Sequence, residues 1–187
     1  RVLINDGLIR MLAVEQQKGE WLRCRVTVGG KVTSAKGVNL PESDLNMPAI
    51  TERDWKCAKW ACEHKIDYLA LSFVRTADEI VQLKTKLYEW KCPGEIPGDS
   101  DMGTSIPVVA KIEMPQAITN LDSILQATDA VMVARGDLGV EMDVAQVPII
   151  QKYILACCNA LGKPCIVATQ MLETMIESVT PTRAEAS

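Results

Sequence analysis

Polar and charged residues follow three short apolar runs in the second half of the sequence. Lys111 and Glu113 follow one run, Asp137 follows the next, and Thr169 follows a third. A buried strand tolerates charge only where it leaves the core, so we expect these side chains at the carboxyl ends of neighbouring strands. In α/β folds this edge of the sheet is where ligands bind and where chemistry takes place.

The residue types at this edge indicate metal-assisted chemistry on an anion. Lys111 and Glu113 are two residues apart on one strand, so their side chains leave the same face. The carboxylates of Glu113 and Asp137, with the Thr169 hydroxyl nearby, suit Mg²⁺ or Mn²⁺, which prefer oxygen ligands and keep positions for substrate oxygens. A cation beside the Lys111 ammonium can stabilise charge that develops during phosphoryl transfer or enolate formation. Gly136 lets the backbone approach a ligand closely, and the following N–H groups can bind a carboxylate or phosphate.

A structural interpretation of the same residues is also possible. Any one of these charged residues alone could form a salt bridge at the rim of the sheet. Three of them at successive strand ends, with Arg75 and Thr169 at the same level, favour a functional site. Ser72 is equally compatible with a supporting hydroxyl and with simple packing, and composition alone makes Lys36 a solvated loop lysine.

The elements that must position these residues change in type along the chain. Residues 1–35 alternate on a period of two with glycines at the breaks, which predicts a small antiparallel sheet, and 31–48 look irregular. From residue 51 onward, strands and helices alternate at intervals of roughly thirty residues, which predicts right-handed βαβ units and a parallel sheet. We expect strands at 66–74, 108–113, 130–137 and 165–170, helices at 51–64, 78–90, from 115, at 147–161 and from 182, and an exposed insertion at 91–106.

These elements predict an α/β fold that is part of a (β/α)₈ TIM barrel, with about four βα units. Residues 1–46 would be the C-terminal part of an inserted small antiparallel β lid domain, and residues 47–187 the partial barrel. A closed barrel needs eight strands and typically about 250 residues, so we interpret the sequence as a fragment.

Composition narrows the class of protein. The 187 residues are 48% apolar and carry a net charge of −4 without a basic block, which gives no support to nucleic-acid or anionic-membrane binding. No apolar run approaches the ~20 residues needed to span a bilayer, and the first residues lack a signal-peptide pattern, although the sequence starts without Met. The seven cysteines form no regular framework, which predicts reduced cytosolic thiols. Cys57 and Cys62 have no second pair that would complete a zinc site.

Seven motifs of the sequence resemble the pyruvate kinase family, and they follow the family's order over nearly the whole chain. They are Ile4-Asn-Asp-Gly-Leu-Ile, Ser34-Ala-Lys-Gly-Val-Asn-Leu-Pro, Ser72-Phe-Val-Arg, Ala110-Lys-Ile-Glu, Met132-Val-Ala-Arg-Gly-Asp-Leu-Gly-Val-Glu, Ala168-Thr-Gln-Met-Leu-Glu-Thr-Met and Pro181-Thr-Arg-Ala-Glu-Ala-Ser.

The resemblance implies transfer of the phosphoryl group of phosphoenolpyruvate to ADP, followed by protonation of the enolate to pyruvate. Lys111 would neutralise the transferring phosphoryl group and the enolate oxygen, and Glu113 and Asp137 would hold Mg²⁺ or Mn²⁺. Gly136 and Asp137 would meet the substrate, with backbone amides taking its carboxylate. Thr169 would contact that carboxylate and help the water network that delivers the proton.

The resemblance also assigns roles outside this cluster. Lys36 would contact the nucleotide phosphates, which revises the interpretation from composition, and Ser72, Arg75 and Arg135 would support the site. It further implies K⁺ with ligands outside this sequence, a cytoplasmic location and a homotetrameric full-length protein. The sequence departs from the family pattern at Met114-Pro-Gln, after the Ala-Lys-Ile-Glu motif, and in the long insertion at 91–106. Both departures should affect local helix geometry more than the chemistry of the site.

Two other functions remain open at this stage. Another enzyme of the phosphoenolpyruvate/pyruvate barrel superfamily, such as a metal-dependent aldolase or a mutase, would use similar carboxylates but lack the lid and the Lys36 loop. A non-catalytic metabolite sensor would be expected to have lost Lys111 or a metal-binding carboxylate, and the sequence retains them. Because the family's first barrel strands, which supply an Arg and the K⁺ ligands, would precede Arg1, we expect these 187 residues alone to be inactive.

Overall fold

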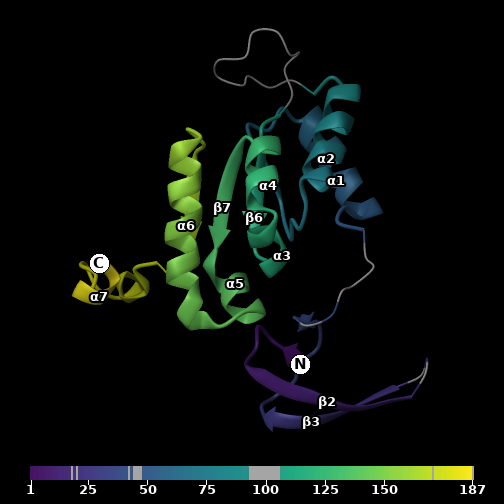
Figure 1. The fold of residues 1–187 in the computed structure, drawn as a ribbon, viewed down its shortest axis with the longest axis vertical. Coiled ribbons are helices and arrows are strands. Elements are labelled where there is room, and N and C mark those ends of the chain that lie inside the picture. Colours follow the sequence, from purple (N-terminus) through teal and green to yellow (C-terminus); the bar gives the residue numbers. More distant parts are fainter. Residues whose placement is uncertain are drawn as a thin grey trace.

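Two sheets of opposite type make up the structure, a computed structural model that describes residues 1–17, 19, 21–41, 43, 48–92, 106–169 and 171–186. An antiparallel sheet carries the N-terminus, and a larger unit of parallel strands and helices lies above it in Figure 1. The expected boundary between residues 46 and 47 falls outside the described residues. Within the described ranges, no helix is both long and apolar enough to cross a membrane.

The antiparallel sheet has the strand order β3-β2-β1-β4. Its strands are β1 (Val2–Ile4), β2 (Ile9–Gln17), β3 (Trp21–Val28) and β4 (Val38–Asn39). The first three confirm the sheet expected for residues 1–35. The short β4 corrects the expectation of irregular structure over 31–48, since Asn39 pairs with Leu3 of β1. Two residues of strand are too short to give a period in the sequence.

The parallel sheet has the strand order β5-β6-β7-β8, so each strand lies beside the next one in the chain. Its strands are β5 (Leu69–Leu71), β6 (Val108–Ile112), β7 (Ala130–Ala134) and β8 (Cys165–Ala168). Lys111, Met132 and Ile166 are register partners across the last three strands. This arrangement confirms the predicted βα units.

Helices connect these strands. They are α1 (Glu52–Glu63), α2 (Ala77–Glu89), α3 (Pro115–Thr119), α4 (Leu121–Ala127), α5 (Arg135–Glu141), α6 (Val147–Ala160) and α7 (Arg183–Ala186), with 3₁₀ turns η1 (Val144–Gln146) and η2 (Glu173–Ile176). The predicted start of α1 is confirmed by a capping box, in which the Asp54 N–H donates to Thr51 Oγ1 and the Thr51 N–H donates to Asp54 Oδ2. Gly162, at φ +64°, follows the end of α6 as expected.

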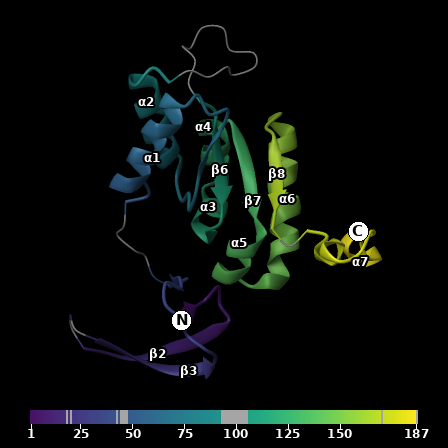
Figure 2. The ribbon, with the colours of Figure 1, turned by 180° about the vertical axis from the view of Figure 1, so that it is seen from behind.

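The helices that connect the strands cover one face of the parallel sheet. In Figure 1 α4 and α6 lie in front of the strands, and the view from behind in Figure 2 shows β6, β7 and β8 uncovered. Alternate strand residues, such as Ile112 and Val131, are fully buried in the apolar core that α2, α4 and α6 complete. Lys111 belongs to the other set of alternate residues and therefore projects from the uncovered face.

Several element boundaries differ from the prediction: β5 is shorter than the strand expected at 66–74, β8 ends at Ala168 before the expected residue 170, and the regions after β6 and β7 differ as well. β7 ends at Ala134, which pairs with Ala168, the last residue of β8. The residues after Ala134 form α5, whose backbone groups bond within the helix, for example from the Met142 N–H to the Leu138 carbonyl, 3.0 Å. Asp137 therefore lies in the first turn of a helix and not at the end of a strand. The single helix expected after residue 115 is interrupted at Asn120, whose side-chain amide donates to the Arg75 carbonyl, 2.9 Å.

The cysteine prediction also needs correction. Cys62, near the end of α1, and Cys92, after α2, form a disulfide. They are thirty residues apart, a spacing that gave no signal, and the packing of α1 against α2 brings their Cα atoms to 4.8 Å. The thiols of Cys57 and Cys158 remain free, and burial raises the pKa of the Cys158 thiol to about 12.

Candidate active site

Lys111 and Glu113 form the centre of the site at the carboxyl end of β6. Lys111 Nζ lies 2.6 Å from Glu113 Oε1 and donates to Ser72 Oγ, 3.1 Å away at the end of β5. The Lys111 side chain is 25% exposed, whereas Glu113 is fully buried. The structure thus brings together three residues that the sequence analysis selected, and it gives Ser72 a contact with the lysine.

Glu113 is held by a group that the sequence analysis did not identify. Its Oε2 accepts the backbone N–H of Phe73, 2.6 Å away, and Phe73 has a left-handed backbone at φ +54°. A buried carboxylate is costly unless it is paired and hydrogen-bonded, and Phe73 and Lys111 satisfy that requirement. No sequence signal could have identified Phe73, because its contribution is a backbone N–H whose direction depends on an unusual φ angle.

The first turn of α5 lies against the end of β8. A Cβ built on Gly136 would be 2.8 Å from Thr169 Cγ2, so only glycine allows this approach. Thr169 has φ +73°, which is a rare conformation for a β-branched residue. Asp137 is half-buried in the same turn. Gly136 and Thr169 are therefore neighbours, and Asp137 follows Gly136 in the chain.

The two arginines proposed as supporting residues contact neighbouring elements. Arg75 Nε lies 3.0 Å from Glu79 Oε1, and its backbone N–H donates to Glu79 Oε2 at the start of α2. Arg135 Nη1 lies 2.8 Å from Met171 Sδ. Arg75 thus ties the loop after β5 to α2, and Arg135 ties the start of α5 to the segment after β8.

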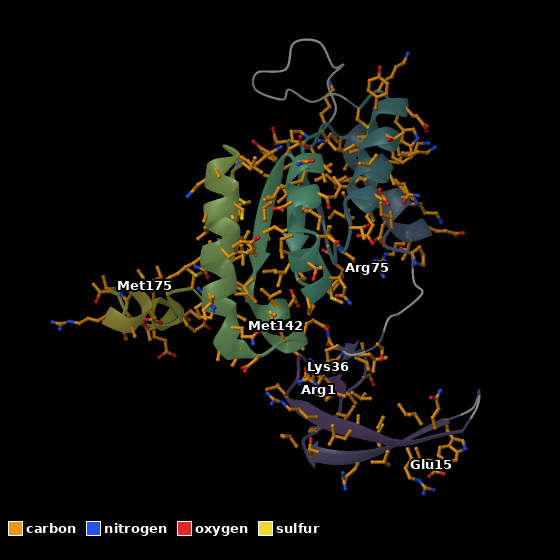
Figure 3. All side chains as sticks on the ribbon, viewed as in Figure 1. Arg1, Glu15, Lys36, Arg75, Met142 and Met175 are labelled. Carbon is orange, nitrogen blue, oxygen red and sulfur yellow. A yellow bond between two sulfur atoms is a disulfide. The ribbon has the colours of Figure 1, made fainter. Side chains whose placement is uncertain are left out.

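Lys36 lies apart from the strand ends, in the antiparallel part of the molecule. It is exposed in the loop before β4, and Figure 3 shows it where this part meets the region of Met142, just after α5. The same junction holds a side-chain hydrogen bond from Asn39 Nδ2 to Glu141 Oε1, 2.8 Å. A cavity of about 560 Å³ opens between the junction and the end of β5, and its lining includes Asn39, Phe73 and Glu141.

The donor set is compatible with a hard divalent cation. Glu113 Oε1 is buried, and its ion pair with Lys111 Nζ is the contact that the described residues give it. Asp137, which carries the other carboxylate predicted for the metal, lies in the first turn of α5. The described residues contain no cluster of three or more His, Cys, Asp or Glu side chains suited to a metal. Two carboxylates with substrate and water oxygens are a common ligand set for Mg²⁺.

Comparison with known proteins identifies the family. The family model described as "Pyruvate kinase, barrel domain" matches residues 1–187. The chain is 40% identical over its whole length to a pyruvate kinase of Clostridium perfringens, of which it covers 37%. It is 39% identical to a pyruvate kinase of Schizosaccharomyces pombe and 42% identical to one of Geobacillus stearothermophilus, of which it covers 34% and 30%.

The chain spans about a third of the length of these relatives. The match also explains the two sheets, because four parallel βα units beside an antiparallel sheet are what part of a TIM barrel with part of its inserted lid contains. Fold, motifs and sequence identity agree, and the chain belongs to the pyruvate kinase family.

Proposed function

We propose that a protein carrying this chain transfers the phosphoryl group of phosphoenolpyruvate to ADP, giving pyruvate and ATP in glycolysis. The observation that supports this proposal most directly is the Lys111 ammonium beside the buried Glu113 carboxylate at the end of β6, in a chain of this family. Phosphoryl transfer requires positive charge fixed where negative charge develops, and this pair supplies it beside a carboxylate suited to a metal.

In this proposal Lys111 is the main electrostatic catalyst. Its Nζ is fixed between Glu113 Oε1 and Ser72 Oγ, so the ammonium has one position and needs little rearrangement when substrate binds. It would neutralise the transferring phosphoryl group and then the enolate oxygen. The partial exposure of Lys111 lets its third N–H face a ligand at the open face of the sheet.

Glu113 and Asp137 would hold Mg²⁺ or Mn²⁺. When bound, the ion supplies Lewis-acid stabilisation of substrate oxygens. Gly136 and Asp137 would meet the substrate, and the backbone amides beside Gly136 would bind its carboxylate. The Thr169 hydroxyl would contact that carboxylate and help order the water that delivers a proton to the enolate carbon.

Other parts of the proposal concern the whole protein. Lys36 would contact nucleotide phosphates from the lid, and K⁺ would bind to ligands outside this sequence. Ser72, Arg75 and Arg135 would support the site through the contacts described above. We also expect a lid domain ending near residue 46, a cytoplasmic location and a homotetramer.

Lys111→Met in the full-length protein tests the central assignment. We expect the turnover number to fall by orders of magnitude, because the ammonium that stabilises the transition state is lost, while Mn²⁺ binding is retained. Lys152→Met on the exposed surface of α6 is the matched control and should turn over normally. An unchanged rate for Lys111→Met would reject the assigned role.

The aldolase alternative is distinguished by the acceptor, and a mutase would convert phosphoenolpyruvate without any acceptor. Full-length protein that converts phosphoenolpyruvate only when ADP is present supports the kinase, and conversion that depends on an aldehyde acceptor supports an aldolase. A metabolite sensor would bind phosphoenolpyruvate without forming pyruvate in either assay.

A further inference from the structure

The antiparallel sheet is joined to the barrel part by a hydrogen bond between residues far apart in the sequence. Asn39 Nδ2, on β4, donates to Glu141 Oε1, on the last turn of α5, over 2.8 Å and across 102 residues. Nearby, Gly7 approaches Val140, since a Cβ on Gly7 would lie 3.7 Å from Val140 Cγ1. The two parts thus meet at α5 through this hydrogen bond and through the approach of Gly7 to the neighbouring Val140.

Burial makes this hydrogen bond important for Glu141. The residue is 6% exposed, and its Oε2 has no hydrogen-bond partner among the described residues. A buried carboxylate with only one satisfied oxygen depends strongly on that one bond, and bonds to charged groups are stronger than those between neutral groups. The amide nitrogen of Asn39 can only donate hydrogen bonds, so it is suited to pairing with the Glu141 carboxylate.

The pair connects two regions that the proposed reaction needs together. Glu141 is four residues after Asp137, so the two carboxylates lie one turn apart on α5. Asn39 is three residues after Lys36 and is fixed in the sheet by its pairing with Leu3. A displacement of Asn39 relative to Glu141 would therefore move Lys36 relative to the Asp137 turn.

We propose that Asn39 and Glu141 are positioning residues that set the lid, and with it Lys36, against the metal and substrate side of the site. This inference rests on the proposed function, because it assigns Lys36 to the nucleotide and Asp137 to the metal. Neither residue touches the reacting atoms. Loss of the pair should therefore affect nucleotide binding and leave the metal site intact.

The test is an exchange of donor and acceptor in the full-length protein. Asn39→Asp places two carboxylates against each other, and we expect the KM for ADP to rise about tenfold, with kcat changed less. Glu141→Gln keeps an acceptor but removes its charge, so a smaller rise is expected. In the double variant the new amide can donate to the new carboxylate, and the KM should return to within about threefold of the wild-type value.

Asn159→Asp, at an exposed position of α6, adds the same charge away from the junction and should leave the KM for ADP unchanged. Mn²⁺ binding, followed by electron paramagnetic resonance, should be equal in all variants. The inference is overturned if the double variant is as impaired as Asn39→Asp, if Asn39→Asp behaves like Asn159→Asp, or if Mn²⁺ binding is lost. An inactive wild-type protein would instead refute the proposed function, which separates the two failures.

Discussion

A side chain at position 136 has no room, because Thr169 occupies the space where its Cβ would be. The nearest atom is Thr169 Cγ2 at 2.8 Å, whereas Thr169 Cβ and Oγ1 are at 3.6 and 3.9 Å, which are ordinary contact distances. The left-handed backbone of Thr169 leaves it little freedom to move away. Glycine at this position therefore maintains the separation between α5 and the end of β8.

Gly136→Ala should lower kcat/KM for phosphoenolpyruvate by about tenfold or more, because α5 and Asp137 must shift by a few tenths of an ångström or more. Thr169→Ser removes Cγ2 and keeps the hydroxyl, so Gly136→Ala combined with Thr169→Ser should recover part of the loss. Steady-state kinetics of the two single variants and the double variant measure this coupling. A double variant with strictly additive losses would contradict the steric argument.

Among single residues, the sequence allowed prediction of those that act through their side chains. Lys111 and Glu113 were predictable, because charged residues directly after a β-branched apolar run mark the point where a buried strand leaves the core. Phe73 was not, because its N–H would be the same for any residue and its direction depends on a fold-specific φ angle. Asn39 and Glu141 were equally hidden, since a pair 102 residues apart leaves no local pattern.

Among the elements, β5 and α2 are enclosed in a covalent ring that begins in the last turn of α1. The Cys62–Cys92 disulfide closes a loop that contains Ser72, which contacts Lys111, and Phe73, which holds Glu113. Both contacts from this βα unit to the site thus come from inside the ring. The disulfide keeps the end of α1 close to the end of α2 and therefore limits how far the loop after β5 can move.

Removal of the disulfide should destabilise the protein. For a loop of thirty residues, the loss of chain constraint corresponds to about 3–4 kcal/mol in the free energy of unfolding, a value that depends on the entropy model. Urea unfolding of Cys62→Ala should show this decrease, and Cys57→Ala, an exposed thiol of the same helix, should not. Equal midpoints for Cys62→Ala and the wild type would show that the disulfide does not contribute.

Element types could be predicted from the sequence better than element ends. The strands from residue 51 onward were identified as short apolar runs, and α2 by the helical spacing of its apolar residues. Their ends depend on pairing partners elsewhere, and for that reason β7 stops at Ala134 and Asp137 lies in a helix. The break at Asn120 likewise depends on the Arg75 carbonyl, which the local sequence does not reveal.

On the scale of the whole molecule, the parallel sheet is incomplete as a barrel. Its outer strands, β5 and β8, each pair with a single strand among the described residues, and one face has no helix layer (Figure 2). Parallel sheets are almost always covered on both faces, so we expect further strands to cover this face in the full-length protein. The match to about a third of each relative agrees with that need.

The 187-residue chain by itself should therefore form no pyruvate. A coupled assay with lactate dehydrogenase, with phosphoenolpyruvate, ADP, Mg²⁺ and K⁺ supplied, measures this directly, and the full-length protein under the same conditions is the positive control. Robust NADH consumption by the short chain would show that four βα units and part of the lid suffice for catalysis.

Because the Cys62–Cys92 disulfide can be reduced, the covalent structure of the protein depends on how a sample is prepared. The disulfide would be intact in protein purified in air and absent in protein kept under strong reductant. The two samples would then differ in the constraint on the segment that holds the Glu113 carboxylate. Activities from two laboratories could then disagree although neither measured wrongly, and a count of titratable sulfhydryls would reconcile them.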